Sequence, residues 1–302
     1  MKRLAPKTIN KIKELIGKEN VLIDEPMKLH TSMEVGGPAA YFFKPENKEQ
    51  LVFLVKTLNE ENYPFYIKGN GSNIICKDEG VNLAIIETRK MIDVQIDGNI
   101  VKAQSGILLK DLSDMILEAH LTGFEFASGI PGSLGGAICM NAGAYDGEMK
   151  CIVKEVTLLD KNGNECKKTN EEMDFSYRHS ICSNGDYIVT DVMLELTLGN
   201  YEDIKSKIDD LTKRRKEKQP LEYPSCGSTF KRPEGYFAGK LITDAGMRGY
   251  CLGGAAVSDK HAGFIINKDH ASAKEILDLI ELVKQKVYEH DGVKLECEVK
   301  II

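Results

Sequence analysis

Apolar residues recur with the 3.6-residue period of an amphipathic helix in several segments of the chain. Near the start, Ile9, Ile12, Leu15 and Ile16 fall on one face of a short predicted helix. The same spacing predicts helices over residues 48–62, 108–120, 201–218 and 273–290. These helices are separated by irregular intervals, so the pattern does not favour a barrel or a doubly wound parallel sheet.

Strand-like segments rich in β-branched and aromatic residues lie between the predicted helices. They read "PFYIK", "LAIIET", "IDVQID", "IVKAQ", "IVKEVTLLD" and "YIVTDVMLEL". Asp97-Gly98-Asn99 is typical of a hairpin turn, and "KNGN" marks another turn between strands that we expect to pair. "KQPLEYPSCGS" contains two prolines and predicts a linker before a small C-terminal α+β unit.

The last segment, "KLECEVKII", alternates strictly between apolar and polar positions. In a strand this alternation places Leu295, Cys297, Val299 and Ile301 on one face. Glu296 and Glu298 then share the opposite face, which must point to solvent or into a cleft. The pattern alone cannot choose between the two glutamates.

The composition is that of an ordinary globular protein. Its 302 residues are 42% hydrophobic and 28% charged, with a net charge of −6. An acidic chain is a poor partner for nucleic acid or an anionic membrane. The basic N-terminal segment never reaches an apolar run, so we expect no signal peptide and a cytoplasmic protein. The eight cysteines are scattered without a C-x-x-C pair, which argues against a bound metal.

Two glycine-rich turns carry candidate binding chemistry. "GNGSN", Gly69–Asn73, follows a predicted strand, and "SGIPGSLGG", Ser128–Gly136, lies about sixty residues later. Glycines allow backbone N–H groups to converge on an anion without obstruction by Cβ atoms. Neither turn matches the Rossmann or the Walker pattern. A plain tight turn for the first and close helix–strand packing for the second remain the structural alternatives.

Eight segments in one order carry a family resemblance. They are "LHTSMEVGGPA", "YIKGNGSNII", "FASGIPGSLGGAICMNAGAYDGE", "SYRHS", "PSCGSTFKRPEG", "AGKLI", "KHAGFIIN" and "LECEV". From about Leu29 onward the chain resembles the UDP-N-acetylenolpyruvoylglucosamine reductases, flavoenzymes of peptidoglycan precursor synthesis. The resemblance implies an α+β flavin-binding fold of the vanillyl-alcohol-oxidase type. It would comprise FAD-binding subdomains over residues 1–86 and 87–200 and a substrate domain over 201–302.

The resemblance also implies noncovalently bound FAD lying against the two turns. Gly69–Asn73 would meet its pyrophosphate, and the second turn would wrap the rest of the cofactor. The implied FAD contacts are Gly69, Asn70, Gly71, Ser72, Asn73, Ser128, Gly129, Ile130, Pro131, Gly132, Gly135, Gly136 and Ala137. On this interpretation, a side chain at Gly132 or Gly136 would occupy space that the cofactor needs.

The implied reaction transfers hydride from NADPH through FAD to the enol ether of a UDP-sugar, and a proton completes the product. Developing negative charge then needs a cation, and Arg178 offers a planar fork that matches a carboxylate. Ser228 is the implied proton donor, and the resemblance favours Glu296 as the third catalytic residue. Without the resemblance, a surface arginine, a turn serine and an exposed strand glutamate would explain all three.

Further expectations rest mainly on the same resemblance. Tyr145 would touch the sugar or the enolpyruvyl group, and Arg214 and Lys218 would reach the UDP phosphates. Those two cations lie four residues apart on one helix face, which could equally be a solvated surface. The short spacing after Arg178 resembles the shorter branch of the family. We expect a monomer whose partners are NADPH and the UDP-sugar.

Three other functions would use parts of the same sequence. A different flavin oxidase would retain the glycine turns but has no reason to combine Arg178, Ser228 and a terminal-strand glutamate. A nucleotide-sugar binding module would need no flavin. A serine hydrolase built on Ser228 lacks the expected G-x-S-x-G motif.

Overall fold

The computed structural model describes residues 3–302, which form two compact units. The first unit contains the residues up to Asp24, Ala40–Asn70 and Asn82–Lys213. The second contains Glu25–Ala39, Gly71–Val81 and Arg214–Ile302. The chain crosses between them several times, so neither unit is a continuous piece of sequence.

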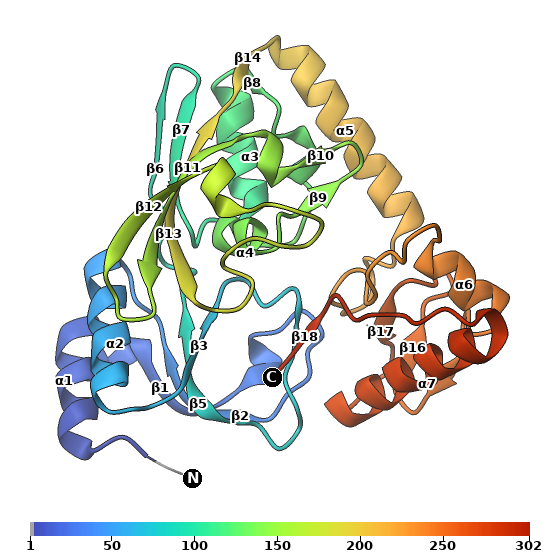
Figure 1. Cartoon of the computed structure of the whole chain (residues 1–302), viewed down its shortest axis with the longest axis horizontal. Helices are drawn as coiled ribbons and strands as arrows, with labels where there is room; N and C mark the ends of the chain where they lie inside the picture. The colour runs from blue at the N-terminus through green and yellow to red at the C-terminus, as the bar shows by residue number, and fades with distance from the viewer. Residues whose placement is uncertain (1–2) are drawn as a thin grey trace. The chain divides into compact units, whose positions relative to one another are not determined.

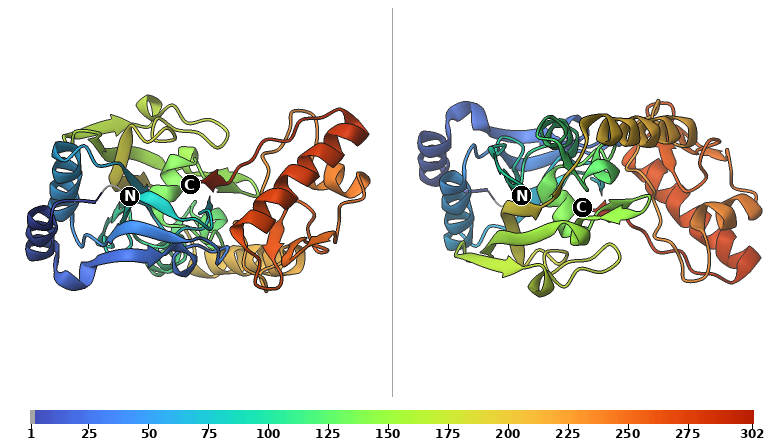
Figure 2. Two further views of the ribbon diagram at one scale, coloured as in Figure 1. Left: turned by 90° about the horizontal axis from the view of Figure 1, so that it is seen from below. Right: turned by 90° about the horizontal axis from the view of Figure 1, so that it is seen from above.

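A four-stranded sheet builds one part of the first unit. Its order is β1 (Val21–Pro26), β2 (Pro38–Phe43), β5 (Val81–Glu87) and β3 (Phe65–Lys68), with β3 parallel to β5. Helices α1 (Pro6–Ile16) and α2 (Lys48–Glu60) pack together and share its core (Figures 1 and 2). Asn47 caps α2 by accepting the backbone N–H of Gln50 at 3.0 Å, which explains where this helix begins.

A five-stranded antiparallel sheet builds the other part of the first unit. Its order is β12 (Glu165–Thr169), β11 (Val153–Asp160), β13 (Tyr187–Glu195), β7 (Ile100–Gln104) and β6 (Val94–Asp97). Helices α3 (Leu109–Glu118) and α4 (Leu134–Cys139) contribute to its hydrophobic core. The predicted hairpin is confirmed, because Asp97 pairs with Ile100 across Gly98 and Asn99.

Smaller elements complete the first unit. Strand β8 (Leu121–Thr122) pairs with β14 (Thr197–Leu198), and β9 (Gly143–Ala144) pairs with β10 (Gly147–Glu148). Helix α5 (Tyr201–Lys218) begins in this unit. The 3₁₀ turns within residues 3–302 are η1 (Lys18–Asn20), η2 (Met27–Leu29), η3 (Glu125–Ala127), η4 (Met149–Cys151) and η5 (Glu171–Met173).

The second unit surrounds a three-stranded sheet of β15 (Cys251–Leu252), β16 (Ala255–Val257) and β17 (Ile265–Asn267). Helices α6 (Ala238–Asp244) and α7 (Ala273–Asp291) pack against each other (Figure 2). Ser272 and Glu275 form a capping box at the start of α7. Strand β18 (Lys300–Ile301) pairs in parallel with β4 (Ile74–Ile75), so the end of the chain lies beside the segment that follows Gly69–Asn73.

The helices predicted from periodicity are confirmed to within a few residues. The last segment differs, because only Lys300–Ile301 forms a regular strand and Ile301 is 43% exposed. The "KNGN" turn joins β11 to β12, a strand that the sequence did not predict, and β13 pairs with the other edge of β11. The boundaries at residues 86 and 200 stay predictions. Within residues 3–302, no helix combines the length and apolarity needed to cross a membrane.

Candidate functional site

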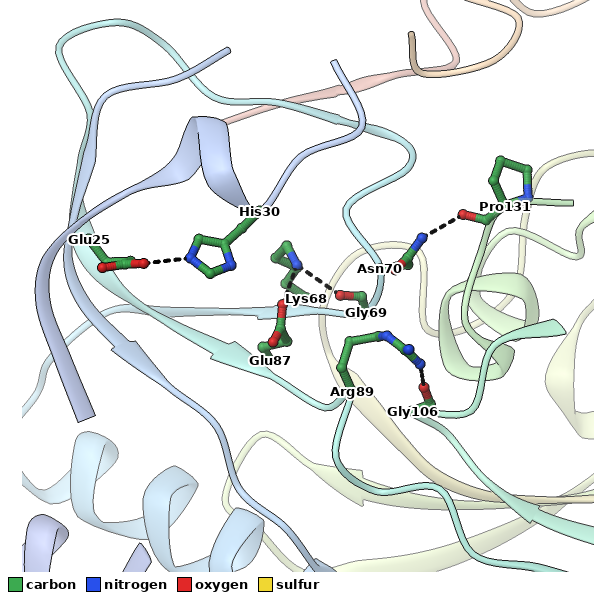
Figure 3. Close-up of polar contacts among 9 residues, drawn as sticks. All are labelled: Glu25, His30, Lys68, Gly69, Asn70, Glu87, Arg89, Gly106 and Pro131. Carbon is green, nitrogen blue, oxygen red and sulfur yellow. Dashed lines mark hydrogen bonds and ion pairs between the residues drawn. The ribbon is translucent and has the colours of Figure 1, made fainter. Parts of the chain in front are cut away.

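The structure brings the first corner of "GNGSN" against the second glycine turn. The Asn70 side-chain amide donates to the Pro131 carbonyl at 2.9 Å (Figure 3). A Cβ atom added at Gly69 would lie 2.1 Å from the Ser133 hydroxyl oxygen. Gly69 is therefore a glycine because Ser133 occupies the space beside it. The two turns, about sixty residues apart in sequence, form one local structure.

The first turn carries backbone donors that the protein does not use. Within residues 3–302, the N–H groups of Asn70, Gly71 and Ser72 donate to no protein acceptor. Gly71 has a φ of +74°, which only glycine adopts at little cost. Asn73 is held differently, because its side chain donates to the Glu298 carbonyl at 3.2 Å and its own carbonyl accepts from Lys300. Adjacent unused N–H groups form a concavity suited to an anion.

Gly135 and Gly136 have different surroundings at the start of α4. A Cβ at Gly135 would lie 2.8 Å from the Cβ of Ser105, and the Gly135 N–H donates to the Ser105 carbonyl at 2.8 Å. Close packing with the end of β7 therefore explains Gly135. Gly136 is exposed, and a Cβ there would meet only the Ser133 hydroxyl at 3.6 Å. The lack of a side chain at Gly136 therefore leaves open space beside Ser133.

Ser133 was not singled out by sequence reasoning. It is 1% exposed, and its hydroxyl is buried without a hydrogen-bond partner among the described residues. Although Ser133 is the N-cap residue of α4, its side chain does not cap the helix. A buried hydroxyl normally has a partner, so this one indicates a polar group that the protein itself does not supply.

Arg178 lies in a tight turn of the first unit. Ser176 and His179 pair across the turn, which leaves Tyr177 and Arg178 at its tip. Arg178 has a φ of +55°, a left-handed conformation that costs a residue with a Cβ about 1–3 kcal/mol. Ser180 and Ser183 both donate to the Cys139 carbonyl, at 3.0 and 2.9 Å. The segment that follows Arg178 is thereby attached to the last residue of α4.

The hairpin of β9 and β10 presents Tyr145 at its tip. Tyr145 also adopts a positive φ, +56°, and its hydroxyl donates to the Leu211 carbonyl at 3.0 Å. The Arg178 guanidinium lies 3.5 Å from the Gly143 carbonyl oxygen, at the base of this hairpin. Two residues predicted to contact substrate therefore lie on adjacent turns, and both are held in conformations that the backbone normally avoids.

Ser228 lies in the second unit, after Gly227. It is half-buried, and its hydroxyl makes no hydrogen bond within the described chain. The next residue, Thr229, is completely buried, and its hydroxyl accepts the Ile265 N–H at 3.0 Å. The position of Ser228 is therefore fixed by a neighbour, while its own hydroxyl remains available for a ligand.

The structure gives the two terminal glutamates different surroundings. Phe230 and Cys297 pair in antiparallel fashion, which places Lys231 opposite Glu296 and Thr229 opposite Glu298. The Glu296 side chain is 75% exposed and ion-paired with Lys231 at 3.3 Å. Glu298 is half-buried, its N–H donates to the Thr229 carbonyl at 2.9 Å, and its carbonyl accepts from Asn73. Glu298 is thus attached to the Ser228 segment and to the first glycine turn.

The remaining predicted residues are less constrained. Arg214 and Lys218 lie in the last turns of α5, as predicted, and both are exposed. His30 is ion-paired with Glu25 at 2.7 Å (Figure 3). Among the described residues, no group of three or more His, Cys, Asp or Glu side chains could hold a metal ion.

Comparison with known proteins identifies the family. Residues 39–167 match the FAD binding domain, and residues 219–302 match "UDP-N-acetylenolpyruvoylglucosamine reductase, C-terminal domain". A Clostridium perfringens protein named UDP-N-acetylenolpyruvoylglucosamine reductase is 53% identical over 96% of this chain and 95% of its own length. One from Caldanaerobacter subterraneus is 48% identical over 97% of each chain. The chain belongs to the UDP-N-acetylenolpyruvoylglucosamine reductase family.

Solved structures support this assignment. A UDP-N-acetylenolpyruvylglucosamine reductase from Thermus caldophilus matches with a TM-score of 0.79 at 33% identity, over 93% of this chain and 97% of that chain. Phl p 4, a grass pollen allergen with glucose dehydrogenase activity, matches over 64% of this chain and 44% of its own with a TM-score of 0.51 at 17% identity, which shows a shared fold alone. The predicted α+β flavin-binding fold is confirmed, and the chain is an FAD-dependent oxidoreductase.

The residues of the two glycine turns fit the FAD of this reductase family. The free N–H groups of Asn70, Gly71 and Ser72 suit a pyrophosphate, and the buried Ser133 hydroxyl beside Gly69 is a further donor that the protein does not use. Gly136 leaves open space beside that hydroxyl. Backbone donors dominate because the turns themselves contain no basic residue.

Ser133→Ala is expected to weaken FAD binding about 10- to 100-fold, the range for a lost hydrogen bond to a charged group. The apoprotein should not be destabilised, and its unfolding free energy should rise by about 1 kcal/mol, because an unpaired buried hydroxyl is removed. Flavin fluorescence titration and denaturant unfolding measure the two effects. Ser105→Ala removes the second unpaired buried hydroxyl found within residues 3–302, under Gly135, and should leave the FAD affinity unchanged. If Ser133→Ala and Ser105→Ala weaken FAD binding equally, the loss arises from disturbed packing of α4 and not from a hydrogen bond to the cofactor.

Proposed function

We propose that this chain reduces the enolpyruvyl ether of UDP-N-acetylglucosamine-enolpyruvate to UDP-N-acetylmuramate, a step of peptidoglycan precursor synthesis. Bound FAD supplies the chemistry by accepting hydride from NADPH and passing it to the carbon–carbon double bond. The observation that carries the proposal is the junction of the two glycine turns, with unused N–H donors and an unpaired buried hydroxyl at one place. Family membership supports the choice of substrate.

Arg178 is proposed to bind the substrate carboxylate. Hydride addition places negative charge on the carbon next to that carboxylate, and a fixed cation stabilises the charge as it develops. Arg178 is half-buried at the tip of a turn, with its guanidinium beside the Gly143 carbonyl. We propose that Tyr145, on the adjacent hairpin, contacts the sugar or the enolpyruvyl group. Arg214 and Lys218 are proposed to contact the UDP phosphates.

Ser228 is proposed to donate the proton that completes the product. A hydroxyl is a weak acid, so its proton transfer needs a nearby group that compensates the charge left on oxygen. We propose Glu298 for this supporting role, in preference to the Glu296 that the resemblance favoured. Glu298 is half-buried and bonded to Thr229 through the backbone, whereas Glu296 is exposed and already ion-paired with Lys231.

The two glutamates provide a matched pair of variants. Glu298→Gln is expected to slow product formation about 10²- to 10⁴-fold, the usual contribution of a proton-transfer group. Glu296→Gln should change the rate by less than about fivefold, because an exposed ion pair contributes about 0–1 kcal/mol. Single-turnover product formation in each variant measures the difference. A severe defect in the Glu296 variant alone would instead support Glu296, the residue that the family resemblance favours, as the group that assists Ser228.

An anaerobic two-step titration tests the function. NADPH should bleach the flavin absorbance, and the enolpyruvyl UDP-sugar should then restore it with formation of one equivalent of product. A protein that cannot hold FAD would support the alternative of a nucleotide-sugar binding module. A flavin that NADPH reduces but this substrate does not reoxidise would indicate a different flavin oxidoreductase.

Cytoplasmic location and a monomeric state are also proposed. The acidic net charge of −6 supports the absence of a nucleic-acid partner. Light scattering on the purified holoprotein should give a mass close to that of one 33.6 kDa chain. A mass near twice this value would replace the monomer with a dimer.

A further inference from the structure

A buried ammonium group contacts the first residue of the first glycine turn. Lys68, the last residue of β3, has a side chain only 2% exposed. Its Nζ atom lies 2.6 Å from Glu87 Oε1 and 3.0 Å from the Gly69 carbonyl oxygen (Figure 3). Burial lowers the pKa of Lys68, and the adjacent Glu87 carboxylate opposes that shift. The amine therefore has two specific partners, a carboxylate on β5 and a main-chain carbonyl in the turn.

Folding alone does not explain this pair. Desolvation of two charges costs about as much as their attraction returns, and apolar residues of similar volume often replace such a pair without loss of stability. Most ion pairs among the described residues are more exposed, as in Lys48 with Glu165, where the side chains are 33% and 45% exposed. The buried pair differs in that its cation also contacts the carbonyl of Gly69.

That carbonyl determines which way the next N–H points. A trans peptide is planar, and its C=O and N–H groups point in opposite directions. Because the Gly69 carbonyl points toward the buried ammonium, the Asn70 N–H points away from it. This N–H is among the donors that the protein leaves unused.

We propose that Lys68 is a positioning residue for FAD: by holding the Gly69 carbonyl, it orients the Asn70 N–H toward the cofactor pyrophosphate. The inference rests on the proposed placement of the pyrophosphate at Gly69–Asn73. A charge-assisted bond to the carbonyl also polarises the peptide and strengthens its N–H as a donor. Because Glu87 balances the ammonium charge, the pair adds no net charge near the cofactor. Its proposed effect is to orient the Asn70 N–H.

Neighbouring contacts restrain the same corner. The Thr88 N–H donates to the Lys68 carbonyl at 3.0 Å, which fixes the main chain just before Gly69. The Asn70 side chain is attached to the Pro131 carbonyl just after it. The main chain is therefore held on both sides of the Gly69–Asn70 peptide, and the Lys68 ammonium contacts the carbonyl of that peptide itself.

The test replaces both charges, so that neither remains buried alone. Lys68→Met/Glu87→Gln is expected to raise the Kd of the apoprotein for FAD about 10- to 100-fold, as for loss of a hydrogen bond to a charged group. Binding of riboflavin, which has no pyrophosphate, should change less than about threefold. The apoprotein melting temperature should stay near the wild-type value. Flavin fluorescence quenching and thermal unfolding provide these readouts.

The exposed pair supplies the control. Lys48→Met/Glu165→Gln makes the same chemical change at a pair with the same 2.6 Å distance, and both Kd values should be unchanged. A folded Lys68/Glu87 variant with wild-type FAD affinity would overturn the proposal, as would equal losses for FAD and riboflavin. Should the double variant not fold, Lys68→Leu/Glu87→Leu decides, because it also removes the Lys68–Gly69 bond and leaves no charge buried alone. Wild-type FAD affinity in that folded variant would reject the proposal.

Failure of this inference is distinguishable from failure of the proposed function. Wild-type holoprotein that is reduced by NADPH and reoxidised by the enolpyruvyl UDP-sugar establishes the function whatever the Lys68 variants do. If the wild-type protein binds FAD but does not carry out this turnover, the proposed substrate is wrong. The role of Lys68 is then still decided by the FAD-binding measurement.

Discussion

Ser228→Ala is expected to leave reduction of the flavin by NADPH unchanged and to slow its reoxidation by the enolpyruvyl UDP-sugar about 10²- to 10⁴-fold. The first half-reaction transfers only hydride, so it does not need the hydroxyl proton. The second half-reaction places negative charge on carbon, which a proton must neutralise. Ser228 is half-buried with its hydroxyl free for a ligand, which is the arrangement that such a donor requires. Stopped-flow absorbance under anaerobic conditions separates the two halves.

Ser206→Ala provides the control for this variant, because Ser206 is an exposed serine on α5. Both half-reactions should proceed at the wild-type rate in that protein. Normal reoxidation in the Ser228 variant would remove this residue from the mechanism. Equal slowing of both halves would instead point to a disturbed flavin environment.

Arg178→Lys is expected to reduce kcat/KM for the UDP-sugar about 10²- to 10³-fold, comparable to loss of one donor to a developing anion. Lysine keeps the positive charge but not the planar fork that binds both oxygens of a carboxylate. The strained φ of +55° does not discriminate between the two residues, since lysine also carries a Cβ. The variant therefore tests geometry at constant charge. Steady-state kinetics with the UDP-sugar as the varied substrate measures it.

Arg3→Lys makes the same substitution at an exposed residue bonded to Asp24 and should leave kcat/KM unchanged. Flavin reduction by NADPH should be normal in the Arg178 variant, because that step does not involve the substrate carboxylate. Near-normal turnover of the Arg178 variant would show that the guanidinium lies outside the reaction.

Local patterns predicted the long helices because their burial is periodic in sequence. Helix α5 was predicted with both of its ends correct, and α7 to within one residue. The short helices α4 and α6 were not predicted, since six and seven residues hold too few apolar positions for a period to emerge. β12 was missed because its alternation leaves only half-buried and exposed residues.

The site was predicted only in part, because sequence patterns show local features and not contacts between distant residues. Glycine density indicated both turns, yet it could not reveal that Gly135 faces Ser105 while Gly136 faces open space. Ser133 carries no signal of its own, because its importance comes from burial beside Gly69 without a partner. The difference between Glu296 and Glu298 arises from Lys231 and Asn73, which are distant in sequence from each other. Such contacts become visible only after folding.

The attachment of Asn73 to the chain's final strand has a kinetic consequence. Asn73 bonds to Glu298 across 225 residues of sequence, and Lys77 and Ile75 bond to Ile302. Contacts between such distant segments form slowly, because closing the long loop between them costs chain entropy before the contact stabilises the fold. The segment Gly69–Asn73, the proposed pyrophosphate site, should therefore form late in refolding. Flavin fluorescence is expected to quench after the far-ultraviolet circular dichroism signal has recovered.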